Sequence, residues 1–192
     1  MHALLGILII VATSLCPNVN SESSVSVVAN DTRPIVKVFD TCERIWQYQV
    51  NSTTEEVRDT CISLTMINIT KDDYYFWRNE TYRRNVGMRD KCHGIFKNGT
   101  RKEALGAIDV WCAEDDEVEE EMELIYTEQY CSIFYVTSPF LRSFQPSKGA
   151  ACRMYILDDA VDGGPTQTCT GNFSNYCPGN KAVYYNKTCK TG

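Results

Sequence analysis

Apolar and polar side chains alternate along most of this chain with a period close to two residues, in short runs that polar turns separate. A period of two is typical of strands buried on one face, whereas an amphipathic helix repeats every 3.6 residues. The pattern therefore predicts a largely antiparallel, all-β domain. The predicted strands are 43–50, 61–69, 74–77, 94–97, 107–112, 118–126, 131–136 and 152–157.

Eight strands at this spacing favour a closed barrel, because closure removes the sheet edges that would otherwise pair with other chains. Asn98-Gly99 predicts a tight turn between two of the strands. The break at 162–165 ends the strand region, and the segment 166–176 predicts a short helix held by Cys169 and Cys177. The predicted fold is an eight-stranded antiparallel barrel followed by a C-terminal helix.

The strand 118–126 shows which side chains face inward, because its apolar residues occupy alternate positions. The inward set is Val118, Glu120, Met122, Leu124 and Tyr126. A buried carboxylate such as Glu120 is costly unless it is paired or binds something; the alternative is that Glu120 lies in water at the open rim. The same alternation puts Trp46 and Tyr48 on one face, and Arg153 and Tyr155 on another. A barrel of about eight strands has room inside for one small ligand.

The first residues predict a leader that directs export of the protein. The apolar run 4–12 is typical of a secretory signal peptide. A membrane anchor needs about 20 apolar residues, and polar Asn18 and Asn20 come too early for one. We expect a signal peptide over 1–20, with its end between 14 and 24, and a single secreted domain over 21–192.

Seven Asn-x-Ser/Thr sequons support export, and each predicts an exposed glycosylation site in a secreted protein. They are at Asn30, Asn51, Asn68, Asn79, Asn98, Asn172 and Asn186. Glycans at these positions would leave a ligand either an interior cavity or a restricted bare patch of surface.

The charge excludes two classes of partner. The formal net charge is −6, whereas nucleic acid and anionic membranes require basic surfaces. Acidic residues concentrate in 114–117 and 119–121, which we interpret as a solvated turn and strand edge. We expect a monomer whose partner is a small molecule, and neither nucleic acid nor a membrane as partner.

No catalytic or metal motif is present in the sequence. Of two histidines, His2 lies in the leader and His93 follows Cys92, where a surface histidine beside a disulfide is expected. The sequence has no Cys-x-x-Cys, no histidine pair and no glycine-rich phosphate loop. We therefore expect no enzyme activity, no cofactor and no metal.

The cysteines and their neighbours resemble those of the tick salivary lipocalins, which include the histamine-binding proteins. The resemblance rests on Tyr126-Thr-Glu-Gln-Tyr-Cys131 with the strand that follows, on Met154-Tyr155-Ile-Leu-Asp158, on Trp46-Gln-Tyr-Gln-Val50, on Cys61, and on the closing Cys169 and Cys189. It implies a lipocalin barrel, secreted in saliva, that sequesters a small host mediator in its cavity to suppress inflammation or haemostasis.

The resemblance also implies two disulfides, Cys61–Cys189 and Cys131–Cys169, which would fasten the barrel wall to the C-terminal segment. Independently, Cys92 and Cys112 flank the turn at Asn98 and are placed to bridge neighbouring strands. Partners for Cys42, Cys152 and Cys177 stay open. If Cys16 leaves with the leader, nine cysteines remain, which predicts one free thiol or an intermolecular bond.

Departures from the family pattern bear on the ligand. The resemblance implies that amine-binding members carry acids where this chain has Ser132 and Arg153. An arginine suits a carboxylate, so the leading hypothesis is a fatty acid or leukotriene with its head on Arg153. Its tail would contact Trp46, Tyr48, Val110, Met122 and Leu124.

Three alternatives stay open. Arg153 can instead form a structural ion pair with Glu120 or point to solvent. A histamine or serotonin site can be assembled from Glu120 and aromatic faces, since aromatic rings stabilise cations. Finally, the acidic strip 114–121 can serve as a surface for a host immune protein such as a complement component.

Overall fold

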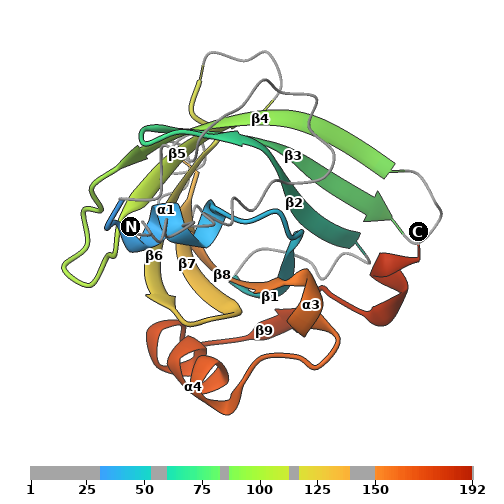
Figure 1. Cartoon of the computed structure of the whole chain (residues 1–192). Helices are drawn as coiled ribbons and strands as arrows, with labels where there is room; N and C mark the ends of the chain where they lie inside the picture. The colour runs from blue at the N-terminus through green and yellow to red at the C-terminus, as the bar shows by residue number, and fades with distance from the viewer. Residues whose placement is uncertain (1–30, 53–59, 83–86, 113–116, 139–149, 192) are drawn as a thin grey trace, which may run out of the picture.

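Eight antiparallel strands close into a barrel in the computed structural model, which describes residues 31–52, 60–82, 87–112, 117–138 and 150–191 (Figure 1). The strands follow the order β2-β3-β4-β5-β6-β7-β8-β1, and the pairing of β1 with β2 closes the ring. A ninth strand, β9, pairs with residues 49–51 of β1, beyond the residues of β1 that pair with β2. The all-β barrel is thus confirmed, while the predicted leader and the Asn30 sequon lie outside the described residues.

The strands lie where the alternation predicts them, with shifts at their ends. They are β1 Ile45–Ser52, β2 Thr60–Ile69, β3 Asp73–Tyr82, β4 Gly87–Lys97, β5 Ala107–Cys112, β6 Glu120–Thr127, β7 Cys131–Thr137, β8 Ala150–Leu157 and β9 Lys181–Val183. The helices are α1 Pro34–Phe39, α3 Asp158–Val161, α4 Gln167–Tyr176 and the 3₁₀ turn η1 Lys187–Lys190. Among the described residues, none of these helices is both long and apolar enough to cross a membrane.

Two strands are longer than predicted for a physical reason. Both β3 and β4 extend several residues beyond their apolar cores, at the end where Arg78, Glu80 and Asp90 lie. Arg78 is paired with Asp90 in the ladder, and both side chains contact each other inside the barrel. Charged residues on an inward face remove the alternation from which a strand is identified.

Helix α1 was not predicted, and it fills one end of the barrel. Pro34 begins the helix, where a missing N–H costs nothing, and Ile35, Val36 and Phe39 are buried. The Phe39 ring lies 4.7 Å from the ring of Tyr74 on β3 and 5.6 Å from that of Phe134 on β7, measured between centroids. Phe39 therefore bridges two walls of the barrel.

A second core lies outside the barrel wall. Figure 1 shows α3, α4 and β9 on one side of the barrel; α3 and β9 lie next to β1, and α4 lies next to β6 and β7. Beneath them the outward side chains Trp46, Ile133 and Met154 pack against Val161 and Phe173. Strands β1 and β8 are therefore buried on both faces, on the inner face by the barrel core and on the outer face by the C-terminal segment.

Four disulfides join described cysteines: Cys61–Cys189, Cys92–Cys112, Cys131–Cys169 and Cys152–Cys177. The first and third are the pairs that the family resemblance implies, and the second is the bridge expected across the turn at Asn98. Cys42 is disulfide-bonded as well. No cysteine in the described part of the chain carries a free thiol. The unpaired cysteine is expected only if Cys16 leaves with the leader, and because Cys16 lies outside the described residues this expectation stays a prediction.

Candidate functional site

The barrel interior changes character from one end to the other. From the α1 end, the inward residues of β3 are Tyr74, Phe76, Arg78 and Glu80. Those of β6 are Leu124, Met122 and Glu120, and those of β8 are Tyr155 and Arg153. An aromatic and aliphatic region next to α1 is therefore followed by a charged layer. We define this charged layer as Arg78, Glu80, Asp90, Glu119, Glu120 and Arg153.

Glu120 and Arg153 bind each other in the charged layer. The Nη1 atom of Arg153 donates to Oε2 of Glu120 at 2.7 Å, and Nη2 donates to Oε1 at 2.6 Å. The side chains are only 15% and 16% exposed. Burial alone would raise the pKa of Glu120, but the charge and hydrogen bonds of Arg153, with the charge of Arg78, hold that pKa below its ordinary value.

Arg78 lies among the remaining three acids. Its Nη1 donates to Oε1 of Glu119 at 2.8 Å, while its Nε is 3.5 Å from Glu80 and its Nη2 is 3.6 Å from Asp90. Burial opposes the charged form of Arg78, yet Glu119, Glu120 and Glu80 raise its pKa above the ordinary value. In the part of the chain that the structure describes, the charged layer thus contains four carboxylates and two guanidinium groups, an excess of two negative charges.

Tyr155 connects the charged layer with the aromatic region. Its ring packs edge-on against Phe134, with centroids 5.6 Å apart, and its hydroxyl donates to Oε1 of Gln47 at 3.4 Å. Burial raises the pKa of Tyr155, so the phenol stays neutral. Tyr155 offers an aromatic face next to Arg153 and Glu120.

Six of the eight residues predicted to contact a ligand face the barrel interior. They are Val110, Glu120, Met122, Leu124, Arg153 and Tyr155. They were found because alternation within one strand identifies the residues that share a face. Asp90 and Arg78 were missed, since their strand segments show no apolar period.

Trp46 and Tyr48 do share a face, as predicted, but it is the outer one. The indole Nε1 of Trp46 donates to Oδ1 of Asp158 at 2.5 Å, and its ring lies 5.3 Å from that of Tyr185. Tyr48 packs against the same Tyr185 ring, with centroids 6.1 Å apart. Both residues therefore hold the C-terminal segment and do not line the interior.

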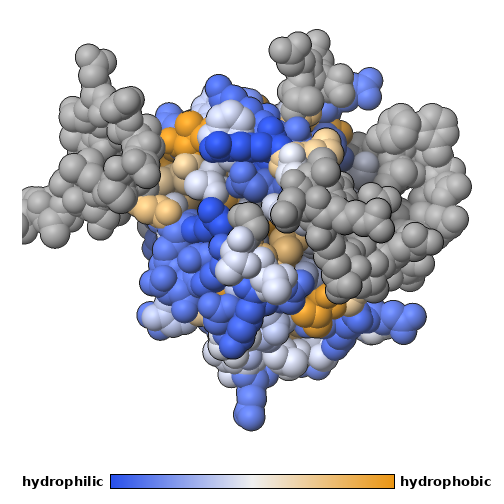
Figure 2. All heavy atoms as spheres, turned by 90° about the vertical axis from the view of Figure 1, so that its right-hand side faces the viewer, coloured by the Kyte–Doolittle hydropathy of each residue, from blue (hydrophilic) through white to orange (hydrophobic). Residues whose placement is uncertain are grey.

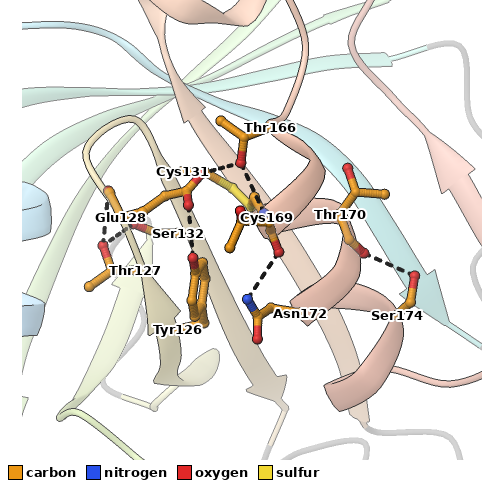
Figure 3. The surroundings of a disulfide bond; sticks show 11 residues. Tyr126, Thr127, Glu128, Cys131, Ser132, Thr166, Cys169, Thr170, Asn172 and Ser174 are labelled. Carbon is orange, nitrogen blue, oxygen red and sulfur yellow. Dashed lines mark hydrogen bonds between the residues drawn. A yellow bond between two sulfur atoms is a disulfide. The ribbon is translucent and has the colours of Figure 1, made fainter.

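Tyr126 also departs from its predicted inward position. A β-bulge between Leu124 and Tyr126 shifts the register of β6 against β7 and turns Tyr126 outward. Its hydroxyl donates to Oε2 of Glu128 at 2.8 Å, beside the Cys131–Cys169 disulfide (Figure 3). Glu128 and these two sulfurs lie within 4.8 Å of one another, but both sulfurs are in a disulfide rather than free to bind a metal.

A pocket of about 440 Å³ lies at the α1 end of the barrel. It extends from α1 to the β6–β7 turn and reaches the inward residues Ile45, Ser132 and Tyr155. Its charged lining residues are Lys37, Asp40 and Glu128. The volume is in the range that proteins use for small ligands.

The described sequons differ in exposure. Asn68, Asn98 and Asn186 are exposed, and Asn79 and Asn172 are half-buried. In contrast, the side-chain amide of Asn51 donates to the carbonyl oxygens of Cys177 at 2.7 Å and Pro178 at 2.6 Å.

Hydrophobic side chains on the surface are scattered. The exposed large hydrophobic residues among those described are Met88, Ile95, Leu105, Tyr130, Tyr176 and Val183. Met88 and Ile95 lie near opposite ends of β4, and the others lie on separate elements or loops. The face shown in Figure 2 is mostly hydrophilic, with small separate hydrophobic spots. The visible part of this face does not resemble a broad apolar docking surface.

The sequence model described as tick histamine binding protein matches residues 38–191 of the chain. A search of curated proteins gives no significant match.

Solved structures match the fold. Japanin from Rhipicephalus appendiculatus, bound to cholesterol, has 12% identity and a TM-score of 0.51, with 76% of this chain and 93% of that chain covered. H1 crustacyanin from the lobster Homarus americanus has 10% identity and a TM-score of 0.48, with 84% and 92% covered. At these identities the likeness concerns the barrel fold alone.

Proposed function

The chain belongs to the tick histamine-binding protein family, and on that premise we propose that it sequesters one small amine inside its barrel. The leader over 1–20 and the sequons support a secreted salivary glycoprotein, and the family supports removal of a host mediator of inflammation or haemostasis as its role. The protein acts by binding, not by catalysis.

The observation that carries this proposal is the negative excess of the charged layer. Among the described residues, four carboxylates lie around two guanidinium groups at this end of the barrel, and their side chains are partly buried. Charges in such a place interact more strongly than in water and favour compensation by a cation. A primary ammonium supplies one positive charge and three donors, while Val110 and Met122 offer apolar contacts to the rest of the ligand.

A ligand with a carboxylate head is the second candidate, supported by the apolar residues further inside. It would share the guanidinium of Arg153 with Glu120, which accepts from two of its five N–H donors. The ligand would then add a further negative charge beside Glu120, and like charges in a partly buried place repel each other. This repulsion disfavours a fatty acid or leukotriene anchored on Arg153.

Binding of a host protein through the acidic strip receives less support. Residues 113–116 lie outside the described part of the chain. Glu121, at the end of the strip, faces outward, and Nζ of Lys97 is 2.8 Å from Glu121 and 2.7 Å from Asp109. Lys97 therefore partly neutralises the charge of Glu121.

Calorimetry with protein from a eukaryotic host tests the proposal. Histamine, serotonin, arachidonic acid and a leukotriene are titrated separately into wild type and two matched variants. Asp90→Asn removes an acid of the charged layer, and Asp109→Asn removes one on the outer face of β5. We expect an amine to bind wild type, with about tenfold weaker binding for Asp90→Asn and unchanged binding for Asp109→Asn.

Binding of a carboxylate ligand without binding of either amine would contradict the proposal. Equal losses in the two variants would also contradict it, because a general electrostatic effect of net charge would then explain the affinity.

A further inference from the structure

A row of stacked rings crosses the outer face of three neighbouring strands. Tyr75 on β3 lies opposite His93 on β4, and His93 lies opposite Trp111 on β5. The ring centroids of Tyr75 and His93 are 4.4 Å apart with 3° between the ring planes, and those of His93 and Trp111 are 5.8 Å apart with 26° between them. The rings therefore stand upright on the sheet and contact each other face to face.

Only one face of the Tyr75 ring takes part in this row. Because that face lies against His93 on β4, the second face is directed toward the other neighbouring strand, β2. Among the described residues, no further aromatic ring or cation contacts Tyr75. The side chain is half-buried, so part of its apolar surface remains in water. Covering that surface would stabilise the protein.

The sequon asparagine Asn68 lies on this side of the ring. Asn68 on β2 is the ladder partner of Tyr75, and the next pair along the two strands is Ile69 with Tyr74. Ile69 and Tyr74 belong to the barrel core, so alternation places Asn68 and Tyr75 on the outer face. Side chains directly opposite in an antiparallel pair have Cβ atoms about 5 Å apart. Asn68 is exposed, and a sugar on its amide would begin beside the Tyr75 ring.

We propose that the first N-acetylglucosamine linked to Asn68 packs on the second face of the Tyr75 ring and extends the stacked row by one member. One face of a pyranose consists of C–H groups, which gain dispersion and apolar burial against an aromatic ring. The sugar is thereby a part of the folded structure, and the glycan shields the outer face of β2 and β3 from other proteins. This inference does not depend on the ligand inside the barrel.

A double-mutant cycle on the secreted glycoprotein tests the contact. Asn68→Gln removes the glycan and should lower the melting temperature by about 3 °C, the shift that one good cross-strand pair produces in a domain of this size. In a Tyr75→Thr background, Asn68→Gln should leave the melting temperature unchanged. The matched background Tyr130→Thr lacks an exposed ring between β6 and β7 and should keep the loss of about 3 °C. Asn98→Gln removes a glycan from the turn after β4 and should have no effect.

Trimming of the glycans isolates the role of the first sugar. An endoglycosidase that leaves one N-acetylglucosamine on each asparagine should preserve the difference between wild type and Asn68→Gln, and complete removal by a peptide N-glycosidase should abolish it. In trimmed wild type, the Tyr75 ring current should shift NMR signals of one sugar upfield, and this shift should be absent in Tyr75→Thr.

Three results would overturn the inference. The first is an unoccupied Asn68 in the secreted protein, and the second is an equal effect of Asn68→Gln with and without the Tyr75 ring. The third, which requires no substitution at Tyr75, is the absence of any upfield-shifted sugar signal in trimmed wild type.

Discussion

Glu120 and Arg153 form a buried ion pair through two short hydrogen bonds, and each depends on the other to remain charged. Desolvation makes a lone buried charge expensive, whereas a well-packed apolar replacement of the whole pair is often tolerated. The pair therefore organises the charged layer without being a large source of net stability. Its presence also explains why the arginine beside Cys152 is compatible with an amine ligand.

Substitution of one partner should reveal this dependence. Arg153→Met should lower the free energy of unfolding by about 3–5 kcal/mol, because Glu120 loses its compensating charge. The double variant Glu120→Leu/Arg153→Met, which replaces the pair by apolar side chains, should recover most of that loss. Urea unfolding measures both, and Lys97→Met on the outer surface, with an expected loss of at most about 1 kcal/mol, is the control. A loss for Arg153→Met no larger than the control would show that the pair is effectively solvated.

The lowered pKa of Glu120 predicts a pH dependence. A carboxylate with a folded-state pKa below its unfolded value, which is about 4.3, stabilises the protein above that value, and this contribution disappears as the pH falls through the folded-state pKa. Wild type should therefore be more stable than Glu120→Gln at pH 7. The difference between them should shrink below about pH 4, as followed by urea unfolding at each pH. A difference independent of pH would contradict the assignment of the lowered pKa to Glu120.

At the scale of elements, the barrel is fastened to its C-terminal segment by three disulfides on its outer side. They connect β2 to η1, β7 to α4, and β8 to the residue that follows α4. The Cys92–Cys112 bond instead links neighbouring strands β4 and β5. The outer bonds close longer loops and should restrict the unfolded chain more.

This comparison gives a testable order. Removal of Cys61–Cys189, with 128 residues between its ends, should cost about 5 kcal/mol, and removal of Cys92–Cys112, with 20, should cost about 3 kcal/mol. Paired Cys→Ala variants, unfolded in urea, provide the measurement. The reverse order would show that packing around Cys92 and Cys112, not loop closure, determines the cost.

The sequence predicts elements well where only one face is buried. The bounds of β5 were predicted without error, and α4 begins one residue after the predicted start. For β1 the prediction that Trp46 and Tyr48 share a face is correct, but the prediction that this face lines the barrel interior is wrong. The C-terminal segment buries the face that carries Trp46, and the barrel buries the face that carries Ile45. The bulge before Tyr126 is a register change, which one strand's pattern does not reveal. Arg78, Glu80 and Asp90 were not predicted as site residues because inward charges on β3 and β4 interrupt the apolar alternation. The same interruption made the predicted strands too short.

At the scale of the whole molecule, the sequons do not form an equivalent set. Asn68 lies near the β2–β3 turn, Asn98 follows β4 and Asn186 precedes η1, all exposed. Asn51 instead uses both amide hydrogens to hold the segment after α4 against β1. A glycosylated asparagine keeps a single amide hydrogen, so a glycan at Asn51 is incompatible with these two bonds.

Site-resolved mass spectrometry of the secreted protein should find glycans at Asn68, Asn98 and Asn186 and none at Asn51. Enzymatic deglycosylation in ¹⁸O-labelled water marks each occupied asparagine as a heavy aspartate. Asn51→Gln should also destabilise the protein, whereas Asn98→Gln should not, because only Asn51 makes hydrogen bonds to distant backbone. Full occupancy of Asn51 in stable protein would contradict this account.

The central claim is that the negative excess inside the barrel binds the ammonium group of a small ligand. A crystal structure of the protein with serotonin tests it most directly. The account predicts the ammonium nitrogen inside the barrel, within hydrogen-bonding distance of a carboxylate of the charged layer, with the Glu120–Arg153 pair intact. A ligand on the outer surface, or a copurified lipid whose carboxylate has displaced Glu120 from Arg153, would contradict it.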